Sequence, residues 1–487
     1  MSKRFVLQVL GVVLIATLVL TACGPTPAAP ATEAPKAAEA TATTAPAAEA
    51  TATTAPAEQP AAKREIVWMV RTGNIENPWE QNVVIPAWEK ENPDIKINLL
   101  IIDQGDIAVK REAMIAAGEP LHVWSTNWGG DGFASDRARG LLTDLTPLIQ
   151  RDQLDMSVFI PEVLAIYASE GKQWGLPFLT TGSYIFYNMK LLDEAGVPYP
   201  TTDWEDKSWT WDAVLDLAKK LTKNYDDPTT AQYGWIEDRQ NIEGPAMLFG
   251  KFPWPEGTYE AGFADSIDLH DPVTIQAYQK HHDLVHKEKV APDSAASAAL
   301  ATLGGTLESG RVAIYETGGW GWWVFSPVTP DVEGGFCWGV APLPWGTPDA
   351  ETRAVIYTDP WVITRGLEGQ ELEDAWAFVK FLAREDNARS YMKATNTPPT
   401  QSKLQEEWFT QFKCMDPAKV KQVYQGAFKH GLESSNHLLV RWDELNQIWG
   451  NSLTPCFDDP NCDMAATLAT VEKDMTDALK RIAEEEK

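Results

Sequence analysis

The sequence predicts an α/β protein in which strands and helices alternate along the chain. Apolar runs at 65–70, 95–102 and 122–126 are typical of buried strands, and segments with helical spacing at 79–91 and 106–117 separate them. Strands that alternate with helices of this length form parallel sheets with right-handed crossovers. At 487 residues the chain is long enough for two such units, each with its own core.

The N-terminus has the features of an export signal. Lys3 and Arg4 precede an apolar run over 5–22, which is only slightly shorter than a membrane anchor. The run ends in LTAC, which resembles the lipobox of bacterial lipoproteins, so we expect residues 1–22 to be a signal peptide and Cys23 to carry lipid. We therefore expect the protein to be at the outer face of the bacterial cytoplasmic membrane, or in the periplasm.

A low-complexity segment follows the lipidated cysteine. Residues 23–63 consist almost wholly of Ala, Thr, Pro and Glu, with TATTAPA occurring twice. Such a composition lacks the apolar residues that would offset the entropy of ordering, and its prolines oppose helix formation. We expect a disordered, extended tether that holds a folded part near the membrane.

The charge balance limits the class of partner. The chain carries 69 Asp and Glu against 41 Lys and Arg, a formal net charge of −28. A field of this sign repels nucleic acid and anionic membrane surfaces, so we expect no nucleic-acid partner. Neutral or cationic ligands remain.

Four cysteines follow Cys23. Cys456 and Cys462 enclose a short FDDPN loop, and we expect them to form a disulfide in an exported protein. Zinc is the alternative, but the pair has no nearby histidine and its spacing is poor for a metal site. Cys337 and Cys414 are either buried thiols, which is the commoner state, or a second bridge.

A second α/β unit is predicted after residue 182. The segment 211–221 has apolar residues at the i, i+3, i+4 and i+7 positions of an amphipathic helix. Strands are expected at 311–316 and 335–344, and a further helix at 375–383. Ligands of such sheets bind beyond the carboxyl ends of the strands, which draws attention to the segments after the first and third strands of the first unit, 71–73 and 127–131.

Several longer stretches resemble a known family when taken in order. The protein resembles the carbohydrate-type solute-binding proteins of ABC importers, the maltose-binding-protein-like class. The stretches that carry the resemblance are GKQWGLPF at 171–178, IFYNMKLLDEAGVPYP at 185–200, SWTWDAVLDLAKKLT at 208–222, GGWGWW at 318–323, GVAPLPWG at 339–346, YTDPWVITRG at 357–366, AWAFVKFLAREDNARSYM at 375–392 and TNTPPT at 395–400.

The resemblance implies a two-lobed periplasmic-binding-protein-like fold with a ligand cleft between the lobes. Lobe 1 would comprise 64–181 plus 361–395, and lobe 2 would comprise 182–360 plus 396–487. Such a protein binds a sugar or oligosaccharide and delivers it to ABC permease subunits by hinge closure. It is expected to be a monomer and not an enzyme, with no cofactor and no metal.

The stretch TGGWGWW at 317–323 is the strongest candidate for ligand contact. Sugar rings present apolar C–H faces, so a site for them needs flat aromatic rings together with planar polar side chains. Glycines allow a close backbone approach to a ligand, and family position makes Trp320 the expected stacking ring. Trp322 and Trp323 are expected in the core.

The remaining expected contacts are spread along the chain. Family position gives Arg71, Trp124, Asn127, Thr181 and Trp442. Asn127 and Thr181 stand where maltodextrin binders have an acidic residue, so their sugar preference is not carried over. The other candidates are Trp128, Asp131, Trp235, Gly319, Asp359 and Trp361, of which Trp235 and Trp361 are equally compatible with core positions.

Three alternatives are kept open. The acidity of the chain permits a cationic ligand such as a polyamine, or a peptide. Asp359 and Glu243, which are candidate hydroxyl acceptors, would in an extracellular glycosidase be the two carboxylates, although Asp359-Pro360 also fits a turn. His282 and His286, at i, i+4 of a helix, have zinc-ligand spacing, but a solvated helix face is the favoured interpretation.

Overall fold

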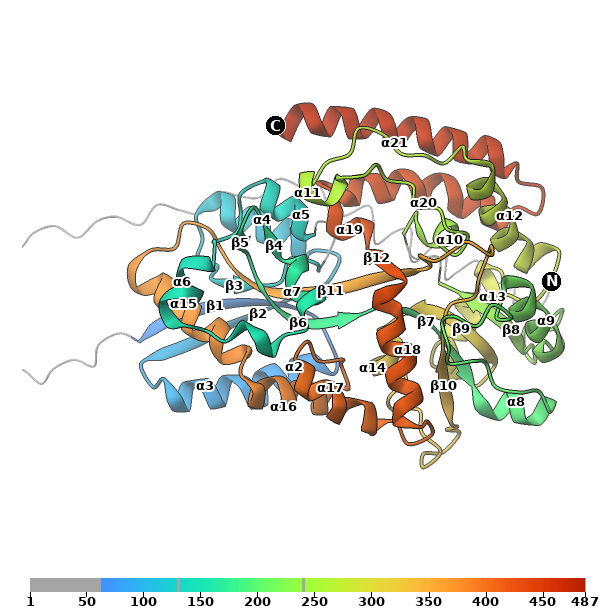
Figure 1. Ribbon diagram of the computed structural model, residues 1–487, viewed down its shortest axis with the longest axis horizontal. Helices are drawn as coiled ribbons and strands as arrows, with labels where there is room; N and C mark the ends of the chain where they lie inside the picture. The colour runs from blue at the N-terminus through green and yellow to red at the C-terminus, as the bar shows by residue number, and fades with distance from the viewer. Residues whose placement is uncertain (1–62, 129–131, 239–240, 487) are drawn as a thin grey trace, which may run out of the picture. The chain divides into compact units, whose positions relative to one another are not determined.

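The computed structural model describes residues 63–128, 132–238 and 241–486, which belong to one compact unit (Figure 1). The expected signal peptide, the lipidated Cys23 and the tether up to residue 62 lie outside the described residues, as does Asp131. In the described ranges no helix combines the length and apolar character needed to cross a membrane.

The first sheet contains six strands, in the order β12-β11-β3-β1-β2 with β6 also paired to β11. The parallel core expected from the sequence is present, because β1 runs parallel to both β2 and β3. The sheet as a whole is mixed, since β11 is antiparallel to β3 and β6. Its strands are β1 (Arg64–Arg71), β2 (Ile95–Ile102), β3 (Val123–Trp124), β6 (Leu176–Thr181), β11 (Ala354–Ile363) and β12 (Gly431–Glu433).

Helices pack the apolar side chains of this sheet into one core. Trp68, fully buried on β1, contacts the ring of Phe378 edge-on at 5.1 Å. The predicted helix at 79–91 is interrupted, and Pro86 lies in the first turn of its second half, where no N–H is needed. The helical elements here are α2 (Glu76–Trp79), a π turn (Glu80–Val84), α3 (Ile85–Glu91), α4 (Ile107–Ala117), α15 (Gly369–Leu382) and α16 (Glu385–Thr395).

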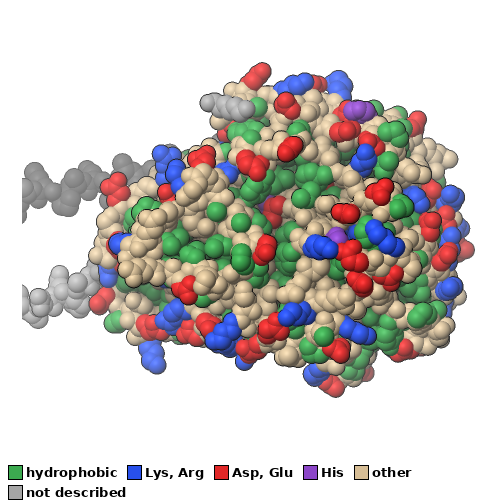
Figure 2. Space-filling model, viewed as in Figure 1, with side chains coloured by type: hydrophobic (Ala, Val, Ile, Leu, Met, Phe, Trp, Pro, Cys, Tyr) green, Lys and Arg blue, Asp and Glu red, His purple; other side chains and the backbone are tan. Residues whose placement is uncertain are grey.

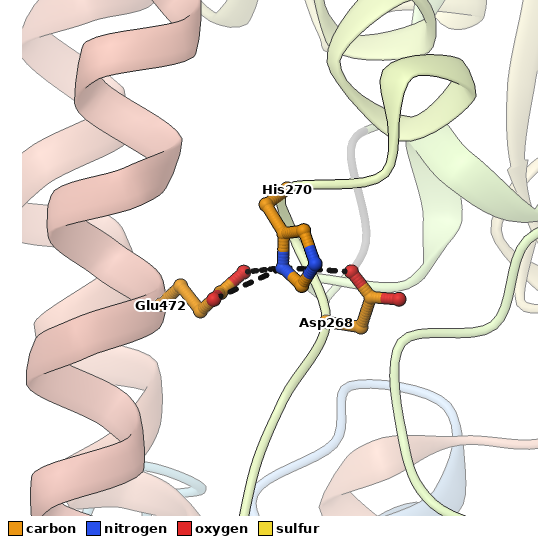
Figure 3. Close-up of side chains that lie close together, drawn as sticks. All are labelled: Asp268, His270 and Glu472. Carbon is orange, nitrogen blue, oxygen red and sulfur yellow. Dashed lines mark hydrogen bonds and ion pairs between the residues drawn. The ribbon is translucent and has the colours of Figure 1, made fainter.

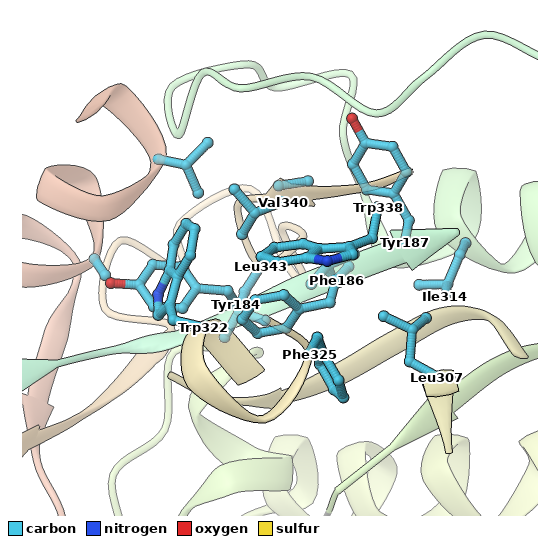
Figure 4. Packing of buried hydrophobic residues seen from close by; sticks show 14 of the residues in the cluster. Tyr184, Phe186, Tyr187, Leu307, Ile314, Trp322, Phe325, Trp338, Val340 and Leu343 are labelled. Atoms are coloured by element: carbon cyan, nitrogen blue, oxygen red, sulfur yellow. The ribbon is translucent and has the colours of Figure 1, made fainter. Parts of the chain in front are cut away.

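The second sheet contains four strands in the order β10-β7-β9-β8. These are β10 (Trp338–Ala341), β7 (Ser183–Asn188), β9 (Val312–Gly318) and β8 (Tyr233–Glu237). Only β8 and β9 are parallel, so this sheet is also mixed. Its core is rich in aromatic rings, with Trp322 lying among Tyr184, Phe186 and Trp338 (Figure 4). Helices α8 (Met189–Ala195), α9 (Trp211–Leu221) and α18 (Pro417–Lys429) contribute to the same core.

A third cluster of apolar residues is built by long helices near the C-terminus. Helix α20 (Trp442–Asp458) packs on α21 (Met464–Glu486), and α12 (Pro272–His286) joins them. His282 and His286 on α12 were predicted to lie on a solvated face, which is wrong for His282, as its side chain is buried. Their Nε2 atoms lie 2.9 Å and 2.8 Å from the carbonyl oxygens of Asp459 and Phe457, so both histidines cap the end of α20.

Shorter elements complete the described chain. They are α5 (Phe133–Ala138), α6 (Thr146–Asp152), a 3₁₀ turn (Met156–Val158), α7 (Pro161–Ile166), β4 (Ala168–Ser169), β5 (Lys172–Gln173), α10 (Gly244–Met247), α11 (Thr258–Ala261), α13 (Ser294–Ala301), a 3₁₀ turn (Leu307–Ser309), α14 (Gly321–Val324), α17 (Ser402–Trp408), a 3₁₀ turn (Phe409–Gln411) and α19 (Ser435–Leu438).

The chain passes from the first sheet to the second through Gly182. This glycine separates β6 from β7, and a Cβ atom there would lie 2.5 Å from the Cβ of Ala427, so no larger residue fits. A later return is made by β11, which starts at Ala354 and is paired in the first sheet along its length. The first sheet therefore includes residues 354–363.

The described residues contain two disulfides. Cys456 is bonded to Cys462, the pairing expected from their spacing. Cys337 is bonded to Cys414, so these residues are not the buried thiols that were favoured. The sequence offered no signal for this pair, because 77 residues separate them and only the fold brings them together.

The two bridges should differ in their effect on stability. In the chain-entropy model, removing the Cys337–Cys414 bridge costs about 4–5 kcal/mol and removing the short Cys456–Cys462 loop costs about 2 kcal/mol. We expect denaturant melts of Cys337→Ser/Cys414→Ser to show about twice the loss of Cys456→Ser/Cys462→Ser. Equal losses, or a larger loss for the short loop, would contradict this ranking.

Candidate functional site

A cavity of about 410 Å³ lies between the two sheets and helix α20. The first sheet contributes residues at or just beyond its strand ends: Arg71 is the last residue of β1, Gln104 follows β2 and Asn127 follows β3. The second sheet contributes Asp238, which follows β8, and Trp320, which follows β9. Polar side chains therefore converge from strand ends of both sheets, as expected for ligand sites of α/β proteins.

The other walls come from β6, β11 and α20. Thr181 and Leu179 are two residues apart on β6, as are Tyr357 and Asp359 on β11, so each pair faces the cavity from one side of its strand. Helix α20 begins at the cavity and presents Trp442, Asp443 and Asn446.

Asp359 is the most strongly buried carboxylate of the cavity wall, with 7% of its surface exposed. Trp128 donates its Nε1–H to the Oδ2 atom at 3.0 Å. Burial raises the pKa of Asp359, and the charges of Arg71 and His437 together with the Trp128 hydrogen bond oppose that rise. The Asp359 carboxylate is therefore an oriented hydrogen-bond acceptor, and its burial costs desolvation free energy.

Arg71 is fixed by its neighbours before any ligand binds. Its Nη2 atom lies 3.1 Å from Oε1 of Glu76, and its guanidinium lies 5.2 Å from the ring centroid of Trp128. A guanidinium that is paired and stacked in this way has little rotamer freedom to lose on binding.

Asn127 is saturated by protein partners. Its Nδ2 donates to the hydroxyl of Tyr167 at 3.1 Å and to the carbonyl of Thr358, and its Oδ1 accepts from the backbone N–H of Phe133 at 2.9 Å. With only 7% of its surface exposed, it holds the wall formed by β3 and β11 together. Its contribution to the site is chiefly positioning.

Trp320 lies half-buried at the cavity, with its ring centroid 5.1 Å from that of Tyr357. The glycines beside it have a different role from the one predicted. A Cβ on Gly318 would lie 2.2 Å from Cζ3 of Trp320, and a Cβ on Gly319 would lie 1.6 Å from the hydroxyl of Thr181. They make room for protein side chains and so orient the indole, instead of admitting a ligand to the backbone.

Several predicted contacts lie behind the cavity. Trp124 and Trp235 are in hydrophobic cores with at most 1% exposed surface, so their assignment to the site is corrected. Trp361 is also in the core and stacks on Phe178 at 4.1 Å. Trp128 and Gly319 touch wall residues, namely Asp359 and Thr181, without lining the cavity. Large aromatic side chains are highly buried on average, and those on buried strands commonly pack in the hydrophobic core.

The prediction missed several lining residues, although most carried a signal. Applying the strand-end rule to β2 and β8 finds Gln104 and Asp238, and strand alternation finds Tyr357 from Asp359. Trp323 is in the core, as predicted, and also lines the cavity, with 8% of its surface exposed. His437, on α19, had no sequence signal.

His437 connects the cavity to residues outside it. Its Nδ1 pairs with the carboxylate of Glu433, four residues earlier. Both side chains are almost fully covered, with 3% and 10% of their surface exposed. The pair joins the end of β12 to α19 and fixes the orientation of the imidazole toward the cavity.

One group with metal-ligand chemistry is found among the described residues, and it lies away from the cavity. Asp268, His270 and Glu472 approach one another at the surface between the 268–270 loop and α21 (Figure 3). His270 Nδ1 lies 3.0 Å from Oε2 of Glu472 and 3.2 Å from Oδ1 of Asp268. The hydrogen bond to Glu472 raises the pKa of His270, so the contacts are those of an ion pair.

The fold and the cavity are typical of a class of protein, the two-lobed α/β binding proteins. Comparison with known sequences agrees. The model of the bacterial extracellular solute-binding protein family matches residues 73–389, and the chain belongs to this family.

Individual relatives are distant in sequence. An arabinooligosaccharide-binding protein of Bacillus subtilis (strain 168) is 22% identical over 376 residues, or 75% of this chain and 78% of that protein. An ABC substrate-binding protein from Listeria monocytogenes in complex with cycloalternan has a TM-score of 0.68 at 20% identity, covering 86% of this chain and 99% of that one. A maltose-bound binding protein of T. maritima has a TM-score of 0.66 at 18% identity, covering 85% and 99%. The fold is thus that of the two-lobed periplasmic binding proteins.

The burial of Asp359 predicts a pH-dependent gain in stability on its neutralisation. Its pKa is higher in the folded protein than the unfolded value of about 3.9, so its ionisation opposes folding above that pH. Asp359→Asn, which keeps an acceptor for Trp128, should raise the free energy of unfolding at pH 7. We expect denaturant melts to show this gain shrinking as the pH falls toward about 4. A pH-independent loss of stability would contradict the assignment.

Proposed function

We propose that the protein is a receptor for a neutral sugar or oligosaccharide. The observation that carries the proposal is the half-buried indole of Trp320 at a cavity whose other walls hold planar polar groups. An indole offers a flat surface to the C–H face of a sugar ring, and carboxylates and amides bind its hydroxyl groups. Tyr357, Trp323 and Trp442 offer further aromatic surface in the same cavity.

The names of similar proteins support the class of ligand. They include the arabinooligosaccharide-binding protein, the cycloalternan complex, and a receptor of Streptomyces glaucescens in complex with acarbose, which has a TM-score of 0.61 at 18% identity and covers 86% of this chain and 99% of that one. These ligands differ in length and linkage. We therefore infer a saccharide without naming which one.

The proposal includes the route of delivery. Lipid on Cys23 and the Ala/Thr/Pro tether would hold a monomeric receptor at the outer face of the cytoplasmic membrane, where it passes its ligand to ABC permease subunits. The lobes proposed from the sequence, 64–181 plus 361–395 and 182–360 plus 396–487, would close on the ligand by a hinge motion. Gly182, between β6 and β7, lies at the first crossing.

The two carboxylates considered for a glycosidase, Asp359 and Glu243, do not line the same cavity. Glycosidases place two carboxylates on opposite sides of one bond. Glu243 is fully buried and accepts from the backbone N–H of Ser435 at 3.0 Å, and it does not line the cavity that Asp359 lines. A polyamine or peptide remains the alternative ligand. A thermal-shift screen of oligosaccharides against polyamines and peptides tests the proposal, since a ligand at one hundred times its Kd stabilises by about 2.7 kcal/mol.

Two neighbouring tryptophans give a matched test of the site. Trp320→Ala should weaken binding of the best saccharide by about 2 kcal/mol, or roughly thirtyfold in Kd, while largely preserving stability. Trp322→Ala, which removes a fully buried ring two positions away, should instead cost about 3–5 kcal/mol of stability. Calorimetric titration of both variants measures their saccharide affinity, and denaturant melts measure their stability. A destabilised Trp320→Ala variant with unchanged affinity would show that Trp320 belongs to the core.

Anchoring is tested separately. Cys23→Ser should leave the protein unprocessed or release it from the membrane fraction, because the tether offers no other apolar segment. Membrane fractionation and mass spectrometry of the N-terminus provide the readout. Unchanged membrane association together with an unchanged N-terminus would refute lipidation at this cysteine.

A further inference from the structure

A second, apolar groove opens on the surface shown in Figure 2. It has a volume of about 520 Å³ and lies between α7 on one side and the segment 252–260 on the other. Leu432 and Leu438 form part of its floor, and Leu432 keeps 40% of its surface exposed. The hydroxyl of Tyr259 donates to the carbonyl of Ile166 and so ties the two sides together. A concave surface lined by aromatic and aliphatic side chains has the shape and chemistry to accept an apolar side chain.

The charged residues that line the groove all have the same sign. They are Glu162, Glu256, Glu260 and Glu433, and no lysine or arginine lines it in the described part of the chain. Glu162, Glu256 and Glu260 are exposed and border the apolar surface. Apolar surface surrounded by carboxylates is complementary to an apolar side chain flanked by cations.

The same charge pattern argues against occupants from this protein. The segment 24–62 carries four glutamates against one lysine and has no large apolar side chain to fill the groove. A second copy of the chain, with a net charge of −28, would be repelled. An anionic membrane surface is disfavoured for the same reason.

We propose that this groove is a docking surface for a partner-protein segment in which apolar side chains are flanked by lysine or arginine. The importer subunits required by the proposed function are the partner that we expect to carry such a segment, so the identity of the partner, but not the groove, rests on that function.

The groove shares a wall with the saccharide cavity. Glu433 lines the groove and pairs directly with His437, which lines the cavity. Trp254 of the groove and Trp442 of the cavity meet edge-on at 6.2 Å. A partner seated in the groove therefore contacts the residues that position the cavity wall, which is where a delivery partner needs to act.

Fluorescence polarisation with labelled peptides tests the docking surface. The probe is GKLFKG, and its comparison peptides are GKSSKG, which lacks the apolar residues, and GELFEG, which reverses the charge. We expect only GKLFKG to bind, with an affinity that falls as salt rises. Leu432→Ser should weaken binding about tenfold. Ala165→Gln, at an exposed position on α7 inside the groove, should do the same by steric filling if Leu432→Ser does not fold.

A matched pair of charge variants separates the groove from the general acidity of the chain. Glu162→Gln/Glu260→Gln should weaken GKLFKG binding about threefold or more. Glu194→Gln/Glu368→Gln changes the same charge at exposed positions outside the groove and should have no effect. Equal binding of GKSSKG, or equal losses in the two pairs, would overturn the proposal. Saccharide titration of each variant distinguishes these outcomes from a failure of the proposed function, which would abolish saccharide binding in the unmutated protein.

Discussion

The geometry of the site depends on an irregularity in the antiparallel pairing of β11 with β6, where two prolines lie opposite each other. Pro360 faces Pro177, and neither can donate a backbone hydrogen bond, so the register shifts between Asp359 and Pro360. The ring of Phe178, beside this irregularity, stacks on Trp361 and fills the core. The irregularity leaves Asp359 at the cavity wall, where burial makes its charge costly but well oriented.

Close packing against two glycines orients the indole of Trp320 on another wall of the cavity. Gly318 accommodates the indole of Trp320, and Gly319 lies against Thr181 at the crossing between the sheets. Both the acceptor and the aromatic surface are therefore fixed by packing before ligand arrives, which limits the entropy lost on binding. Residues that hold these groups, such as Asn127 and Trp128, have no polar atom left for the ligand or lie behind the wall.

The sequence predicts local structure here better than it predicts the site. The expected 211–221 helix and 95–102 strand coincide with α9 and β2, because their periodicity is strong and local. The strand-end rule drew attention to Arg71 and Asn127, and both residues line the cavity. Trp124 and Trp235 were misplaced because one sequence does not say which face of a buried strand meets the core. His437 and the Cys337–Cys414 bridge depend on contacts between distant segments, which periodicity does not contain.

The central claim is that both sheets close on a saccharide held in the cavity between them. The most direct measurement is the distance between spin labels at Asp106 and Gln447, which are exposed and are neighbours in sequence of the cavity residues Gln104, which follows β2, and Asn446, which is on α20. Double electron–electron resonance spectroscopy should show a shift to shorter distances between the two labels when a saturating saccharide is added. An unchanged distance distribution, with calorimetry showing that the same saccharide is bound, would contradict the account.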